Sequence, residues 1–203
     1  MSPRYVGLEI RIECEQCWQS LPINGPVRGS IRCAFCGETV ALADHVVGPM
    51  KHALKWYDEV RRDVEERSVS LKQDAYYRFM YVKQEPRCVD CAQPLPVSDV
   101  EPGTDGEILC SCGAACRTAP PPDWVTAEVP SASQLFCCEP EAVASTPPPA
   151  CSCPKCGGPL ALDTEIRRIH RCSYCQTRIF IPEDVWTKLH PTPKLRRWFV
   201  RFD

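Results

Sequence analysis

Alternating apolar and polar residues predict short strands in several parts of the chain. Residues 5–12 (YVGLEIRI) and 76–82 (YYRFMYV) carry apolar or aromatic side chains at alternate positions, as does a strand with one buried face. Two further stretches have apolar residues two positions apart: Val40 with Leu42, and Ile179 with Ile181. The pattern predicts a mainly β protein.

One segment has the periodicity of a helix. Between residues 44 and 70, apolar residues recur at steps of three and four, and charged residues fill the other face. The apolar stripe consists of Met50, Leu54, Tyr57, Val60 or Arg61, and Val64. We expect an amphipathic helix that begins near Pro49 and packs on the preceding part of the chain. A partner-binding coiled coil is the alternative, although the stripe lasts only about two heptads.

Cysteine changes this picture, because 16 of the 203 residues are cysteine, a share typical of disulfide scaffolds or metal-binding proteins. Twelve of them form six short clusters in three successive pairs: CEQC at 14–17 with CAFC at 33–36, CVDC at 88–91 with CSC at 110–112, and CPKC at 153–156 with CSYC at 172–175. In the first and third pairs, fifteen residues separate the inner cysteines, a spacing typical of four-thiolate zinc sites.

The cellular compartment decides between metal ions and disulfides. No apolar stretch follows the first residues and no run approaches a membrane span, so we expect a soluble cytoplasmic protein with reduced thiols. We therefore favour zinc; iron is the other metal that four thiolates hold, but an electron carrier seldom needs three copies. Each unit is too small to fold on its core alone, so the metal must supply folding free energy, on the order of 10 kcal/mol per site.

The segments after the second cluster of each pair align with one another. From Cys36, Cys112 and Cys175, each runs through an alternating strand to a proline or acidic break, and then to a valine or tryptophan. In this register Cys116 falls where Val40 and Ile179 stand, so we expect a buried apolar residue there. The alternative is that Cys112 and Cys116 form the second ligand pair of the middle unit.

With glycine after the second cysteine in three clusters, the chain resembles the zinc-ribbon, or rubredoxin-like knuckle, superfamily over about half of its length. The resemblance implies a small, metal-stabilised, mainly β fold, with three zinc ribbons in tandem and one amphipathic helix between the first and second. It implies three Zn²⁺ sites, with these ligands: Cys14, Cys17, Cys33 and Cys36; Cys88, Cys91, Cys110 and Cys112; Cys153, Cys156, Cys172 and Cys175. The middle unit departs from the pattern, because only one residue separates Cys110 from Cys112.

The expected organisation has five parts. They are zinc ribbon 1 at 1–43, the helix or connector at 44–70, zinc ribbon 2 at 71–126, a Pro/Ala/Ser-rich linker at 127–150, and zinc ribbon 3 with a C-terminal strand at 151–203.

That last strand is predicted by residues 196–203 (RRWFVRFD). Trp198, Val200 and Phe202 alternate with Phe199 and Arg201, so an apolar row lies on one face. A free tail would expose large aromatic rings, so we expect this strand to close the sheet of the third ribbon; a partner-binding strand is the alternative.

Besides Cys116, three cysteines remain outside the pairs. Cys137 and Cys138 end an apolar stretch that we expect to be a strand containing thiols, and one edge of a further metal site is the alternative. Cys151, two residues before Cys153, is not expected to compete for the third metal.

Charge is nearly balanced, with a net charge of −2, but it is unevenly placed. Residues 84–150 contain ten acidic residues and two arginines, whereas residues 165–203 contain nine basic and four acidic residues. A basic ribbon that exposes aromatics such as Tyr174, Phe180 and Trp198 would suit nucleic acid. The ordinary interpretation of such a modest surplus is a solvated face.

The sequence lacks the common catalytic signatures, such as HExxH, GxSxG and a Gly-rich phosphate loop, and a four-thiolate site leaves no position for substrate. We therefore expect a non-enzymatic scaffold or adaptor whose ribbon surfaces bind a protein partner within a larger assembly, away from membranes. The alternative is a transcription- or RNA-associated protein that binds nucleic acid through the basic C-terminal ribbon.

Overall fold

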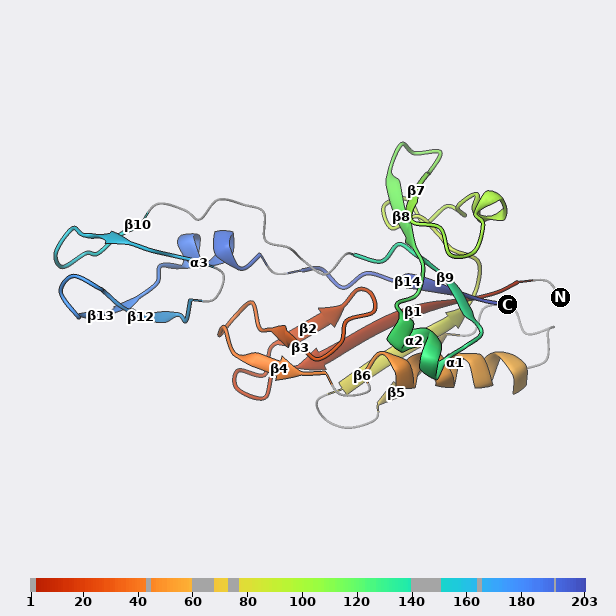
Figure 1. Cartoon of the computed structure of the whole chain (residues 1–203), viewed down its shortest axis with the longest axis horizontal. Coiled ribbons are helices and arrows are strands. Elements are labelled where there is room, and N and C mark those ends of the chain that lie inside the picture. Colours follow the sequence, from red (N-terminus) through yellow and green to blue (C-terminus); the bar gives the residue numbers. More distant parts are fainter. Residues whose placement is uncertain are drawn as a thin grey trace.

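The computed structural model describes residues 3–42, 45–59, 68–72, 77–139, 151–163, 166–191 and 193–203, and over them the protein is mainly β (Figure 1). The strands are β1 (Arg4–Glu13), β2 (Ser20–Ile23), β3 (Ser30–Arg32), β4 (Thr39–Ala41), β5 (Ser68–Lys72), β6 (Tyr77–Lys83), β7 (Gly106–Leu109), β8 (Ala115–Ala119), β9 (Ala132–Phe136), β10 (Cys151–Ser152), β11 (Pro159–Leu160), β12 (Ile169–Arg171), β13 (Arg178–Phe180) and β14 (Trp198–Phe202). The α-helices are α1 (Val47–Glu59), α2 (Asp123–Glu128) and α3 (Glu183–Leu189), and one 3₁₀ turn covers Val97–Asp99.

Eight strands form one antiparallel sheet. Its order is β5-β6-β1-β14-β9-β8-β7, and β2 also pairs with β1. The first and last strands are direct neighbours, because Arg4 pairs with Phe202 and Leu8 with Trp198. Three two-stranded sheets complete the described strands: β3-β4, β10-β11 and β12-β13.

One face of the main sheet packs against helix α1. Alternate residues of β1 point to this face, as the two-residue period of a strand requires, and Val6, Leu8, Ile10 and Ile12 are all buried there. The buried side of α1 and alternate residues of β14 join the same core: Met50, Ala53, Trp198, Val200 and Phe202. Figure 1 shows α1 lying along this side of the strands.

The opposite face of the same strands packs against the residues around the second cysteine pair. Tyr5 and Phe199 lie in a second core cluster with Phe136 and Ile108, and the rings of Tyr5 and Phe136 meet edge to face at 6.1 Å. Strands β1 and β14 are therefore covered on both faces. The Phe199 side chain packs directly on the backbone of Gly7, since a Cβ on Gly7 would lie 2.9 Å from the Phe199 ring.

In each of the three pairs of cysteine clusters, a helix follows the second cluster. Strand β4 leads to α1, β8 to α2 and β13 to α3. The aligned segments of the sequence therefore share a helix as well as a strand. The helix expected over residues 44–70 is present as α1, but the expected range is wrong at its C-terminal end, because residues 68–70 belong to strand β5. Val60, Arg61 and Val64 lie outside the described residues. None of the described helices has the length and apolar character to cross a bilayer.

The linker expected at 127–150 is wrong over its first part. Strand β9 pairs with β14 on one side and β8 on the other, and its Leu135 and Phe136 are fully buried. The overall composition of residues 127–150 does not reveal a strand as short as β9. The prolines before Asp123 precede helix α2, where proline is tolerated because the first N–H groups of a helix lack partners. The expectation of an apolar strand leading to Cys137 is confirmed. Residues 140–150 lie outside the described part of the chain.

The C-terminal strand forms, with its predicted apolar row buried, but its predicted place is wrong. Strand β14 pairs with β1 and β9 in the main sheet, whereas the third cysteine pair lies in the separate hairpins β10-β11 and β12-β13. Alternation predicts that a strand forms and which face is apolar, but it does not specify the neighbouring strand.

Candidate metal centres

The fold brings twelve cysteines together in three groups of four. In each group the four sulfur atoms lie within 4.8 Å of one another. The groups are Cys14, Cys17, Cys33 and Cys36; Cys88, Cys91, Cys110 and Cys112; and Cys153, Cys156, Cys172 and Cys175. All twelve cysteines that the sequence suggested as ligands are in these groups, and in the second group Cys112 rather than Cys116 is the fourth member.

The distances between sulfur atoms fit a tetrahedral metal ion. In the first group Cys14 Sγ lies 3.6 Å from Cys36 Sγ, and the matching pairs in the other groups are 3.5–3.8 Å apart. Four sulfurs placed at metal–sulfur bonds of about 2.3 Å form a tetrahedron with edges of about 3.8 Å, whereas a disulfide bond is about 2.05 Å long. The donor set and its spacing therefore fit one four-thiolate ion in each group.

The same backbone turn holds every cysteine cluster. The residue after the second cysteine has a positive φ in all six: Trp18, Gly37, Ala92, Gly113, Gly157 and Gln176. In the five CxxC clusters its N–H donates to the carbonyl of the first cysteine four residues earlier, as from Gly37 to Cys33 at 2.9 Å. Glycine marks three of these positions in the sequence, and nothing marks the other three.

The short middle cluster keeps this design with one residue fewer. The N–H of Gly113 donates to the carbonyl of Cys110, only three residues earlier, at 2.9 Å. Gly113 still has a positive φ of 89°, and Cys112 Sγ lies 3.7 Å from Cys88 Sγ. With one residue fewer, the turn is tighter, and the fourth thiol still lies close to the other three sulfur atoms of the group.

Local hydrogen bonds favour the thiolate at some cysteines of the groups, whereas desolvation and neighbouring thiols raise the pKa of others, such as Cys91 and Cys156, to about 12. Backbone N–H groups of Cys91 and Asp90 lower the pKa of Cys88 to about 6. The Thr177 side chain and N–H lower the pKa of Cys175 to about 6. Because the thiolate is the metal-binding form of cysteine, these thiols are prepared for a metal near neutral pH.

The cysteines outside the groups are mostly buried. Cys116, Cys137 and Cys138 are 3–6% exposed, and Cys116 and Cys137 belong to the core between the second group and the sheet. Burial raises the pKa of the Cys137 and Cys138 thiols, so both stay protonated and apolar. Cys151 is half-buried in strand β10, opposite Leu160. The prediction that Cys116 is a buried apolar residue is confirmed.

The first and third groups lie in units that contact one another directly. Trp186 Nε1, from helix α3, donates to the carbonyl of Ala34 at 2.6 Å, and Arg168 donates to the carbonyl of Phe35 at 3.3 Å. Ala34 and Phe35 are the two residues between Cys33 and Cys36. A Cβ on Gly37 would lie 3.1 Å from the Trp186 ring. The second cluster of the first unit is therefore packed against α3, a contact that sequence reasoning missed.

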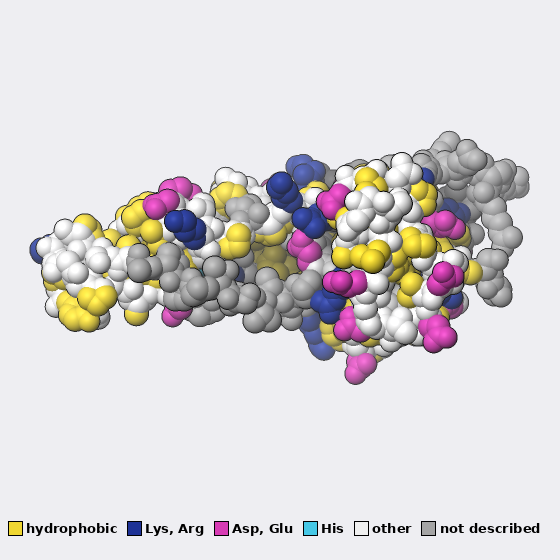
Figure 2. Space-filling view, turned by 90° about the horizontal axis from the view of Figure 1, so that it is seen from above, with side chains coloured by type: hydrophobic (Ala, Val, Ile, Leu, Met, Phe, Trp, Pro, Cys, Tyr) yellow, Lys and Arg dark blue, Asp and Glu magenta, His cyan; other side chains and the backbone are white. Residues whose placement is uncertain are grey.

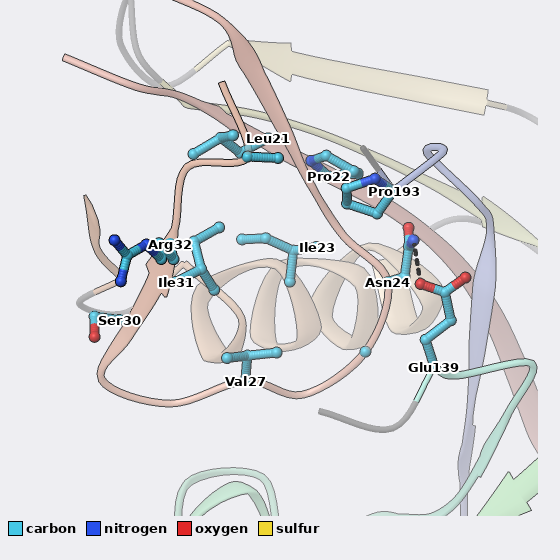
Figure 3. A pocket seen from close by; sticks show the side chains of 12 residues that line it. Leu21, Pro22, Ile23, Asn24, Val27, Ser30, Ile31, Arg32, Glu139 and Pro193 are labelled. Carbon is cyan, nitrogen blue, oxygen red and sulfur yellow. Dashed lines mark hydrogen bonds between the residues drawn. The ribbon is translucent and has the colours of Figure 1, made fainter. Parts of the chain in front are cut away.

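A small cavity lies in the first unit. It has a volume of about 330 Å³ and lies between strands β2 and β3. Leu21, Ile23, Val27 and Ile31 form apolar walls, and Figure 3 shows these side chains around one space. At one end Asn24 donates to Glu139 at 2.8 Å. Among the described strands, β2 pairs only with β1 and β3 only with β4, so each has an unpaired edge.

The exposure of the aromatic side chains and the placement of charge agree only in part with what the sequence predicted. Tyr174 and Phe180 are exposed as expected, but Trp198 is fully buried, and its Nε1 donates to the Ile23 carbonyl at 3.1 Å. On the face shown in Figure 2, acidic side chains gather over the half of the molecule that holds the main sheet and the second unit.

No protein-family model, curated protein or solved structure matches the chain. The class of protein is therefore defined by the fold and the cysteine groups of this chain alone. It is a mainly β protein with three four-cysteine groups that could each hold a metal ion.

Proposed function

We propose that this chain is a zinc-stabilised, non-enzymatic scaffold that binds a protein partner. The observation that carries the proposal is the set of three four-thiol groups, each with the sulfur spacing of a tetrahedral site. Zinc is the typical ion for such a donor set, and four protein ligands leave no coordination position for a substrate. Zinc would act here by stabilising the fold.

The third unit supports a structural role for the metal. Among the residues that the structure describes, its core cluster contains nine buried ones, two of which are the candidate ligands Cys153 and Cys172. A core of this size does not stabilise a domain by itself, so the free energy of metal binding, on the order of 10 kcal/mol per site, would contribute most of the stability.

The cavity between β2 and β3 is the surface that best suits a protein partner. Its volume of about 330 Å³ is at the lower end of the range for binding pockets. Apolar walls between two unpaired strand edges suit an extended peptide, which forms main-chain hydrogen bonds along an edge and inserts apolar side chains. We assign this cavity to an apolar extended segment of the partner.

Native mass spectrometry of the intact protein tests the metal assignment. We expect three zinc ions in the native chain and in Cys116→Val, because Cys116 lies outside the second group, but only two in Cys112→Ser. One ion or none in the native chain, or iron in place of zinc, would overturn the assignment.

Photo-crosslinking tests the partner assignment. A photoreactive amino acid at position 27 should crosslink one defined protein in cells, and the same reagent at exposed Arg28 should crosslink it much less. Adding Ile31→Glu should abolish that product while three zinc ions remain bound. A product that persists in this variant would show that the cavity is not the binding site.

A further inference from the structure

The outward face of the β12-β13 hairpin carries four side chains in two cross-strand pairs. Ile169 lies opposite Phe180 and Arg171 opposite Arg178. Residues directly opposite in antiparallel strands share a face, and these four positions are two residues apart, so all lie on one side. All four residues are exposed, with Ile169 at 58% and Phe180 at 60%. The face therefore presents an apolar pair beside a cationic pair.

The other two units provide an internal comparison, because their second hairpins have the same register about the cysteine cluster. In the first unit the equivalent pairs are Ser30 with Ala41 and Arg32 with Thr39. In the second they are Glu107 with Arg117 and Leu109 with Ala115. Of the three units, only the third combines a large apolar pair with two like charges.

Stability of the hairpin does not explain this arrangement, since like charges directly opposite one another are destabilising. In the main sheet Arg11 also lies opposite Arg78, but there Glu13 Oε1 is 3.8 Å from Arg78 Nη2. Residues 169–180 contain no acidic side chain.

The negative charge of four bound thiolates does not explain the arginines either. The second unit has a group of the same four ligands, and its equivalent positions carry Leu109 and Ala115. The arginine pair is therefore a feature of the third unit alone and not a requirement of a four-thiolate site.

The Phe180 ring is held in place from one side. The Arg168 guanidinium carbon lies 4.8 Å from the ring centroid, and Arg168 is itself fixed by an ion pair with Glu183 and by the Phe35 carbonyl. A ring that is positioned in advance and still 60% exposed offers a flat surface for stacking at little cost in conformational entropy.

We propose that this face, formed by Ile169, Arg171, Arg178 and Phe180, binds single-stranded nucleic acid. A base would stack on Phe180 beside Ile169, and Arg171 with Arg178 would contact the phosphates. The two cross-strand pairs are about 7 Å apart along the hairpin, which lets neighbouring parts of one strand reach both. Duplexes keep their bases stacked internally, so an exposed ring favours a single strand. This site is separate from the proposed peptide cavity and does not depend on it.

Fluorescence anisotropy with the zinc-loaded full chain tests the proposal. The probes are labelled twelve-nucleotide oligo-dT and oligo-U, each measured at several salt concentrations. We expect Arg171→Gln/Arg178→Gln to weaken binding at least tenfold and to reduce the slope of log K against log salt by about 1.4, or about 0.7 for each lost phosphate contact. Phe180→Leu, which keeps an apolar side chain, should weaken binding without changing the slope.

The matched control is Arg28→Gln/Lys188→Gln, which removes the same charge from two other exposed positions and should leave the affinity within twofold. Native mass spectrometry must show three zinc ions in every variant. Equal losses in the control and test variants, tighter binding of the matching duplex, or tighter binding of a poly-glutamate peptide would each overturn the proposal, the last in favour of an acidic protein partner.

Discussion

The residue after each second cysteine adopts a left-handed backbone conformation, although its side chain differs from cluster to cluster. Three of the six are glycine and the others are Trp18, Ala92 and Gln176. A residue with a Cβ costs about 1–2 kcal/mol in this conformation, and metal binding on the order of 10 kcal/mol per site exceeds that cost. The proposed metal ion, held by the two cysteines that precede each of these positions, would therefore offset the strain at Trp18, Ala92 and Gln176.

Exchanging the residue types within one unit should reveal this strain. Gln176→Gly should stabilise the third unit by about 1 kcal/mol or slightly less, because glycine also gains freedom in the unfolded chain. Gly157→Gln should destabilise it by about 1 kcal/mol, since a Cβ there meets nothing within 4 Å and only backbone strain changes. Urea denaturation of the zinc-loaded chain measures both.

A nearby substitution provides the control. Ser173→Gly lies in the same loop but at a position without positive φ, so it should be neutral or destabilising. If Gln176→Gly and Ser173→Gly change stability by the same amount, left-handed strain does not account for the effect.

Among the elements, strand β14 is the one on which most of the main sheet depends. It joins β1 to β9, and its Trp198, Phe199, Val200 and Phe202 are at most 1% exposed. Without it, the β5-β6-β1 and β9-β8-β7 parts of the sheet have no shared strand. Strand β14 is thus an interior element of the fold although it is the last described strand in chain order.

Deleting residues 197–203 should abolish cooperative unfolding of the main sheet but leave zinc in the third group, whose hairpins do not include β14. Hydrogen exchange should show loss of protection in β1 and β9, and native mass spectrometry should still detect the third ion. Arg196→Gln, just outside the deletion, is the control. An intact sheet combined with loss of the third metal would restore the original prediction that this strand closes the third unit.

The elements also show what the sequence can predict. Alternation was sufficient for β1, β6 and β14, and cysteine spacing was sufficient for the first and third groups, because both signals are local. In the middle unit the sequence left Cys112 with Cys116 as an alternative second pair, and only the structure distinguishes the two. The pairing of β1 with β14 could not be predicted, since backbone hydrogen bonds are alike in every strand and register depends on the assembled core. The helix was predicted too long at its C-terminal end because helical periodicity does not mark where a helix stops, and residues 68–70 of the expected range belong to strand β5.

For the whole molecule, the contact between the first and third units decides whether the third unit moves as part of the same body. Trp186 is central, since it is 1% exposed, stacks on His190 at 3.9 Å and donates to Ala34. This contact joins a helix of one unit to the ligand loop of another.

Trp186→Phe should loosen this contact and keep the metals. The variant loses one hydrogen bond, worth about 0.5–1.5 kcal/mol, and leaves the Ala34 carbonyl without its donor. ¹⁵N relaxation should show that residues 151–190 tumble faster than the main sheet in the variant but together with it in the native chain. Trp124→Phe, in helix α2, is the control. Identical correlation times in native protein and variant would show that other contacts hold the units together.

The pairing of the first strand with the last has a consequence for biosynthesis. Glu9 and Arg197 form an ion pair although they are 188 residues apart in sequence. At a translation rate of about 5–20 residues per second, β1 leaves the ribosome on the order of 10–40 seconds before β14 exists. All twelve clustered cysteines emerge before β14, so the nascent chain can bind its three ions while one edge of β1 still lacks its final neighbour. Metal binding in the proposed centres can therefore precede completion of the main sheet.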